Sequence, residues 1–162
     1  MAALQFATAS NLADDPQPRE NSNDRALGPD KQIRILSISP EEEDHAALFQ
    51  ILDKLPFRVT TARTCLEAAA CLGLDQFGII LCECKLPDGN WTEILNRIES
   101  AAGQPLLIVT SRVADVSLWA EVLNLGGYDL LAKPFSHQEV RHVLTSAWVQ
   151  RANPVRSAVA TS

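Results

Sequence analysis

Residues 77–89 read FGIILCECKLPDG, an apolar run that stops at one acidic residue, Glu83. A short and continuously apolar strand is typical of a parallel sheet that helices cover on both faces. The Leu-Pro-Asp-Gly sequence that follows is a turn signal. The stretch therefore predicts a buried central strand with a charged residue at its carboxyl end.

Four further apolar runs predict strands, at residues 33–39, 57–61, 106–109 and 128–131. Apolar residues with helical spacing predict a helix after each strand. They are Leu48, Ile51, Leu52 and Leu55; Leu66, Ala69 and Ala70; Ile94, Leu95 and Ile98; residues 118–125; and Val140, Val143, Leu144 and Ala147. Five strands that alternate with five helices predict an α/β fold. We expect a doubly wound three-layer sandwich around a five-stranded parallel sheet.

The chain has 162 residues, which fits one domain. Residues 1–31 and 152–162 lack either apolar period, so we expect a disordered N-terminal tail and a flexible C-terminal tail. The folded domain is then expected at residues 32–151.

Composition excludes several classes of function. The net charge is −6 and no cluster of Lys and Arg occurs, which argues against nucleic-acid binding. No apolar stretch approaches the roughly 20 residues that span a bilayer. Four cysteines lack the spacing of a disulfide framework or a zinc site, and the chain starts without the charges of a signal peptide. We expect a cytoplasmic protein that contacts neither nucleic acid nor membrane.

Polar residues stand where the predicted strands end. Ser39 and Pro40 follow the first strand, Glu83 ends the third, Thr110 follows the fourth and Lys133 follows the fifth. Ligands of open α/β sheets bind beyond the carboxyl ends of the strands. We therefore expect these residues to form one site.

Three segments resemble the receiver domain of response regulators, of the chemotaxis-regulator (CheY-like) type. They are the strand and Leu-Pro-Asp-Gly loop of residues 77–89, the hydroxyl pair Thr110-Ser111, and the ending GGYDLLAKPF of residues 126–135. The resemblance covers residues 33 to about 151. It implies a flavodoxin-like receiver fold and a role in two-component (phosphorelay) signalling.

The resemblance also implies a set of site residues, from which this sequence departs. In the family an acidic pair holds Mg²⁺ beside an aspartate that accepts phosphate, with a hydroxyl and a lysine nearby. Here Ser39 and Pro40 occupy the acidic-pair positions, and Glu83 occupies the phosphoacceptor position; only Thr110 and Lys133 match. We expect a degenerate receiver without catalytic residues, metal or cofactor, in which Mg²⁺ binding is lost. Glu83 is expected to pair with Lys133, with the Thr110 hydroxyl as a further partner.

Two interpretations fit the sequence Ser39-Pro40-Glu41-Glu42-Glu43. In the first, Ser39 as N-cap and a glutamate three residues later form a capping box. In the second, one of the three glutamates approaches a cation in the site.

The predicted fourth helix carries Trp119. Ala120 and Leu123 fit an inward stripe, which turns Trp119 toward the edge of the helix or the solvent, where it either anchors a partner or folds over its own helix edge. In receivers the face from the fourth to the fifth helix contacts partners, and Leu130 stands where the family has a switching aromatic residue. Tyr128 precedes Leu130 by two residues, which predicts the same strand face.

The sequence thus predicts a single-domain, non-enzymatic receiver that acts by binding a protein, either a histidine kinase or a downstream regulator. A homodimer through the face between the fourth and fifth helices is a second option. One alternative is an active phosphoacceptor that uses Glu83 with a histidine kinase. Another is a flavodoxin-like cofactor-binding protein, although the first strand–helix turn lacks a phosphate-cradling loop.

Overall fold

The computed structural model describes residues 32–101 and 103–152. Its main sheet has five parallel strands in the order β3–β2–β4–β7–β8. The strands are β2 (Ile33–Ile38), β3 (Phe57–Ala62), β4 (Ile79–Glu83), β7 (Leu106–Ser111) and β8 (Asp129–Ala132). The predicted five-stranded parallel sheet is confirmed.

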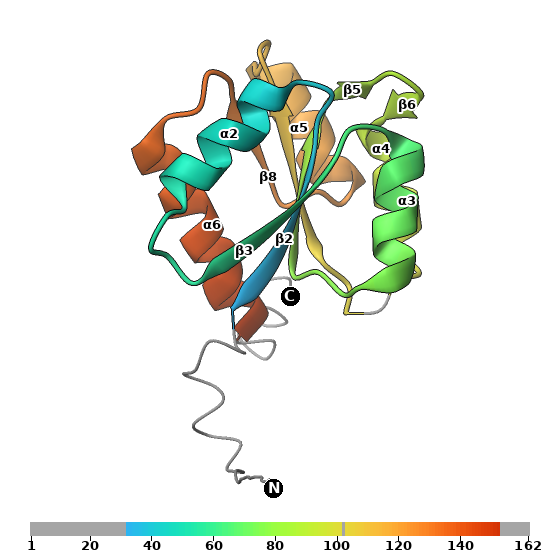
Figure 1. Ribbon diagram of the computed structural model, residues 1–162. Helices are drawn as coiled ribbons and strands as arrows, with labels where there is room; N and C mark the ends of the chain where they lie inside the picture. Colours follow the sequence, from blue (N-terminus) through green and yellow to red (C-terminus); the bar gives the residue numbers. More distant parts are fainter. Residues whose placement is uncertain (1–31, 102, 153–162) are drawn as a thin grey trace, which may run out of the picture. The chain divides into compact units, whose positions relative to one another are not determined.

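Helices cover both faces of this sheet (Figure 1). They are α2 (Glu42–Ile51), α3 (Cys65–Leu74), α4 (Trp91–Ile98), α5 (Val116–Leu125) and α6 (His137–Ala152). One core contains buried residues of α3, α4 and α5, and the other contains buried residues of α2 and α6. The chain is therefore the predicted doubly wound three-layer α/β sandwich.

Strand β4 shows why its sequence is apolar without interruption. Ile79 and Leu81 belong to one core, whereas Ile80 and Cys82 belong to the other. Successive side chains of a strand point to opposite faces, so a strand covered on both sides needs apolar residues at every position.

Two helices have a different inward face from the one predicted. In α3 the buried residues are Cys65 and Ala68, while Leu66 is 76% exposed. In α5 Val122 is buried, Ala120 is half-buried and Leu123 is 37% exposed. The sequence of α3 has one polar residue, Glu67, so it does not define a polar side that would fix the helical phase. In α5 Ser117, Glu121 and Asn124 share one exposed side, and the buried Val122 lies away from it.

A two-stranded antiparallel hairpin, β5 (Lys85–Leu86) with β6 (Gly89–Asn90), follows β4 and was not predicted. Its turn residue Asp88 accepts hydrogen bonds from the backbone N–H groups of Cys65 (2.8 Å) and Leu66 (3.0 Å). Both donors lie at the start of α3, which has N–H groups without helical partners. The hairpin thus supports a helix that precedes it in the chain.

The predicted N-terminal tail and residues 153–162 of the predicted C-terminal tail lie outside the described residues. Ala152, assigned to that tail from the sequence, is instead the last residue of α6. Among the described residues no helix is both long enough and apolar enough to span a membrane.

Candidate functional site

The carboxyl ends of the central strands meet at one edge of the sheet. Glu83, the last residue of β4, pairs in register with Thr110 of β7. The backbone N–H of Lys133, directly after β8, donates to the carbonyl of Ser111 (3.0 Å). Ser39, directly after β2, donates its backbone N–H to Ala62 of β3 (2.9 Å). The strand ends singled out in the sequence therefore lie along one edge, as expected for a parallel sheet.

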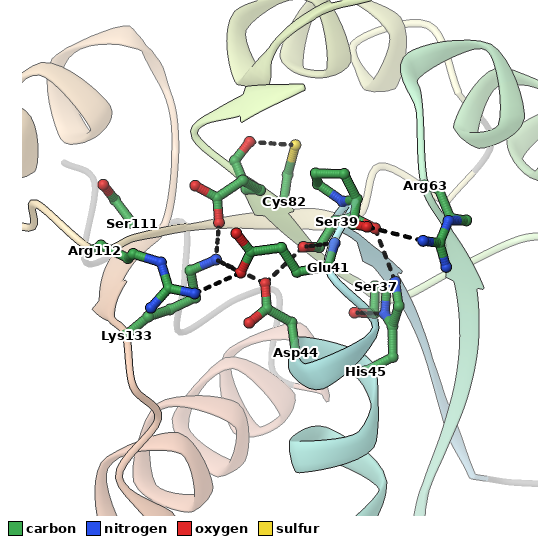
Figure 2. Close-up of polar contacts among 12 residues, drawn as sticks. Ser37, Ser39, Glu41, Asp44, His45, Arg63, Cys82, Ser111, Arg112 and Lys133 are labelled. Atoms are coloured by element: carbon green, nitrogen blue, oxygen red, sulfur yellow. Dashed lines mark hydrogen bonds and ion pairs between the residues drawn. The ribbon is translucent and has the colours of Figure 1, made fainter. Parts of the chain in front are cut away.

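Lys133 is the centre of an ionic cluster. Its side chain is only 3% exposed, and its Nζ lies 2.7 Å from Asp44 Oδ2 and 3.4 Å from Glu41 Oε1 (Figure 2). The same Nζ also contacts Glu83 Oε1. The predicted ion pair between Glu83 and Lys133 is confirmed, and two further carboxylates join it. We call Glu41, Asp44, Glu83 and Lys133 the lysine cluster.

Asp44 is a residue that the sequence interpretation missed. It lies in the first turn of α2, is 7% exposed, and accepts a 2.6 Å hydrogen bond from the Ser39 hydroxyl besides its bond with Lys133. The signal was present in the sequence, because Asp44 precedes Leu48 by four residues and so lies on the inward stripe of its helix. A charged residue on such a stripe requires a buried partner, and Lys133 is that partner.

The predicted capping box at Ser39 is wrong. Helix α2 begins at Glu42, its N-cap is Glu41, and no side chain caps it. Ser39 lies before the helix, where its hydroxyl accepts from the backbone N–H of Glu41 (3.1 Å) and donates to Asp44. Through its bond with the Asp44 carboxylate, a strong acceptor, Ser39 belongs to the site. Pro40 has no side-chain role there, and its carbonyl accepts from Arg63 (3.0 Å).

His45 holds the turn between β2 and α2 through its two ring nitrogens. Its side chain is buried, with Nε2 donating to the carbonyl of Ser39 (2.9 Å). A carbonyl only accepts, so Nε2 carries a proton, and Nδ1 lies within hydrogen-bond distance of the Ser37 hydroxyl (2.9 Å). These bonds hold the backbone that presents Ser39 and Asp44.

Glu41 extends the cluster toward the surface. One of its oxygens accepts from Arg112 at 2.7 Å, and the Arg112 side chain is 61% exposed. Glu41 thus contacts the positively charged side chains of Arg112 and Lys133, whereas the interpretation in which a glutamate approaches a bound cation stays a prediction. Together with Arg112, the lysine cluster has three negative and two positive charges, so it is close to neutral without any bound ion.

Burial by itself would lower the pKa of Lys133, because an ammonium group loses hydration. The hydrogen bond with Asp44 and the contact and charge of Glu83 outweigh this effect, and the pKa of Lys133 is raised. The lysine is therefore charged at neutral pH. An ammonium group has three N–H donors, and three carboxylates of the same chain face it.

Thr110 is close to the cluster but not bonded to it. The residue is 3% exposed, and its carbonyl accepts from the backbone N–H of Cys84 (2.8 Å). Among the described residues its hydroxyl has no hydrogen-bond partner, so the expected bond to Glu83 or Lys133 is not formed.

Cys82 and Cys84 flank Glu83 and pack on the same core, as the two-residue period predicts. Burial is the main cause that raises the pKa of each thiol. Both are therefore protonated at neutral pH, which disfavours a nucleophilic or redox role.

Trp119 lies on the outer side of α5 and is 46% exposed, as predicted. Its Nε1 donates to Asp129 Oδ1 at 3.3 Å. It lines an open pocket of about 250 Å³ together with Ala114, Asp115, Val116, Leu130, Ala132 and Glu139. We call this the Trp119 pocket.

Leu130 lies at the base of this region, 8% exposed and part of the core beneath α5. Tyr128 packs against the other core. The expectation that the two share a strand face is wrong, because β8 begins at Asp129 and Tyr128 lies before the regular alternation.

The sequence of residues 35–145 matches the model of the response regulator receiver domain. The chain belongs to this family. A receiver domain is a signalling module of two-component response regulators, and the fold and the position of the lysine cluster agree with that assignment.

Curated relatives of this receiver domain are longer transcriptional regulators. It is 32% identical over 110 residues to the C4-dicarboxylate transport transcriptional regulatory protein DctD of Pseudomonas aeruginosa. The aligned segment covers 65% of this chain and 23% of that protein. It is 30% identical over 116 residues to the transcriptional regulatory protein FixJ of Bradyrhizobium diazoefficiens, covering 69% and 54%. The chain thus matches between about a quarter and half of the length of these two relatives.

Solved receiver domains have the same fold. The signal receiver domain of an HD domain-containing protein from Pseudomonas fluorescens Pf-5 superposes with a TM-score of 0.69 at 25% identity, covering 77% of this chain and 93% of that one. A CheY-like response regulator receiver domain protein from Methanospirillum hungatei gives 0.67 at 23% identity, covering 75% and 98%. The beryllofluoride-activated NtrC4 receiver domain gives 0.67 at 24% identity, covering 73% and 98%.

The residues of this receiver domain do not fit Mg²⁺, the metal that the family implies. Mg²⁺ requires hard oxygen ligands in near-octahedral geometry. Ser39 and Pro40 provide no carboxylate at the acidic-pair positions, and the carboxylates of Asp44 and Glu83 both contact the Lys133 ammonium. Across residues 32–101 and 103–152 no group of three or more His, Cys, Asp or Glu side chains is arranged to hold a metal ion.

Proposed function

We propose that this receiver domain binds other proteins in two-component (phosphorelay) signalling without the usual phosphorylation of an aspartate. The observation that supports this most is the lysine cluster. Lys133, the residue that would contact a phosphoryl group in the family, is buried against three carboxylates of its own chain. Ion pairs within the chain thus occupy the place where a phosphoryl group would contact the lysine.

An active phosphoacceptor site at Glu83 is less well supported. The Glu83 carboxylate would have to leave Lys133, and the lysine would then have to leave Asp44 to contact the new phosphoryl group. Phosphoryl transfer also requires cations that neutralise the developing charge. Asp44 and Glu41 add negative charge at that point instead.

A flavodoxin-like cofactor site has still less support. A helix N-terminus attracts phosphate when its N–H groups are free and its surroundings are not acidic. Here the first turn of α2 contains Glu42, Glu43 and Asp44. A phosphate group at this turn would meet three like charges.

The partners that we propose follow from the family and from the composition. A histidine kinase or a downstream regulator fits the receiver fold, and the net charge of −6 argues against nucleic acid. The four cysteines are free, which agrees with a reducing compartment such as the cytoplasm. We infer a non-enzymatic role without a cofactor.

Intact mass spectrometry tests this function. The full chain is incubated with acetyl phosphate and Mg²⁺, in parallel with the Glu83→Gln variant. We expect no added phosphate on either protein, because Ser39 and Pro40 offer no carboxylate to Mg²⁺ and the Glu83 carboxylate is held by Lys133. A phosphate adduct on the wild-type chain that disappears in Glu83→Gln would refute the proposal.

A further inference from the structure

The surface around the Trp119 pocket is apolar at its centre. Val116 and Trp119, which line the pocket, are 78% and 46% exposed, respectively. The indole N–H of Trp119 already donates a hydrogen bond within the chain, to the carboxylate of Asp129. The indole area left to a partner is therefore carbon surface, and its burial would be favourable.

The rim of the pocket is acidic. Residues 113–132 contain three Asp and Glu and no Lys or Arg. Asp115 lines the pocket from the start of α5, and Glu139 lines it from α6. Both residues are exposed, so their charges reach the solvent.

The cations nearest in sequence are not available to balance this charge. Arg112 pairs with Glu41 on the side of the lysine cluster, and Lys133 is buried within it. Arg141 follows Glu139 by two residues and so lies about 200° further around α6. The carboxylates of the rim thus have no Lys or Arg partner among the described residues.

This charge pattern disfavours a second copy of the chain as the occupant. A two-fold interface brings the same surface of both copies together. Asp115 and Glu139 of one copy would then face those of the other, and like charges across an interface are unfavourable. A different chain that supplies positive charge has no such cost.

We propose that the Trp119 pocket binds a cationic amphipathic segment of another protein. An apolar side chain of that segment enters the pocket, and flanking Lys or Arg side chains pair with Asp115 and Glu139. The inference rests on the proposed function as a protein-binding module, for which it names the class of partner. It also favours a complex with a different protein over a homodimer.

Two synthetic amphipathic peptides serve as probes, with the same leucines on one helical face and either lysines or glutamates on the other. Binding to the full chain is measured by isothermal titration calorimetry at low and high salt. We expect the lysine peptide to bind one-to-one, more weakly at high salt, and the glutamate peptide not to bind. The reverse preference, or equal binding of both peptides, would overturn the proposal.

Matched variants assign the site. Asp115→Asn/Glu139→Gln should weaken the lysine peptide at least about tenfold, which corresponds to about 1.4 kcal/mol. Asp115 is the N-cap of α5, where its side chain accepts from the backbone N–H of Leu118 (2.8 Å), and asparagine is also a good N-cap, so the start of α5 is retained. Asp53→Asn/Glu99→Gln removes the same charge at exposed positions elsewhere and should leave affinity unchanged. An equal loss in both double variants would reveal nonspecific attraction and refute the site.

Trp119→Ala should weaken the lysine peptide at least about tenfold as well, with a melting temperature close to that of the wild type. If this variant unfolds, the charge variants still decide the question. Sedimentation of the wild-type chain gives the remaining test: a dimer that Trp119→Ala dissociates would make a second copy the occupant. Phosphate uptake in the mass experiment would refute the proposed function and leave the peptide result standing, so the two failures are distinguishable.

Discussion

At Lys133 an ammonium group faces the carboxylates of Glu41, Asp44 and Glu83 in a setting that is largely shielded from water. A buried ion pair stabilises a fold less than its Coulomb attraction suggests, because both groups lose hydration. Removal of one partner, however, leaves a charge with too few partners. The cluster therefore acts mainly as a constraint on the conformation of the site.

Asp44→Asn tests the effect of removing one charged partner of Lys133. The amide can still accept from Ser39 but no longer neutralises Lys133, so we expect the free energy of unfolding to fall by about 2 kcal/mol. Glu42→Gln, on the same helix, changes only an exposed pair with Arg63 (2.8 Å) and should lower it by less than about 1 kcal/mol. Urea denaturation measures both. Equal effects would show that Asp44 has no special role.

Among the elements, α3 depends on a loop that is distant in sequence. Asp88 accepts from the first two N–H groups of the helix, and these bonds, first of all the one from Cys65, lower the pKa of its carboxyl group. A lowered pKa in the folded state means that the contribution of this cap is complete above the unfolded value near 3.8. It is lost as the pH falls through the folded pKa.

Asp88→Ala should therefore speed hydrogen exchange at the amides of Cys65 and Leu66 at neutral pH, because no other acceptor reaches them. Asp88→Asn should still protect one of the two amides from exchange, because the asparagine side chain keeps one acceptor oxygen where the carboxylate has two. Asp75→Ala, at the other end of α3, removes an exposed pair with Arg34 and should not affect these two amides. Unchanged exchange in Asp88→Ala would mean that the loop does not hold the helix.

Considered over the whole molecule, the fold could be predicted from the sequence because its strands are buried on both faces and continuously apolar. The phase of α3 could not, since Glu67 is its only polar residue. The phase of α5 was assigned from Ala120 and Leu123 alone, without the polar side that Ser117, Glu121 and Asn124 form. The hairpin β5–β6 escaped prediction because strands of two residues have no measurable period.

The candidate site was predictable only in part. Glu83, Thr110 and Lys133 follow from where strands end, because a parallel sheet gathers its carboxyl ends at one edge. Asp44 comes from a helix, so its place in the cluster depends on how α2 packs. A carboxylate on an apolar stripe was the one sequence signal for it.

If the lysine cluster occupies the place of the phosphoryl group, this receiver domain should not respond to a phosphoryl mimic. NMR of the ¹⁵N-labelled full chain tests it directly, by addition of Mg²⁺ and then beryllofluoride, with the NtrC4 receiver domain as the responsive control. We predict that the amide signals of Glu83, Cys84 and Thr110 shift no more than that of the remote residue Glu99. Saturable shifts at Glu83 and Thr110 that extend to Leu130 would contradict the claim.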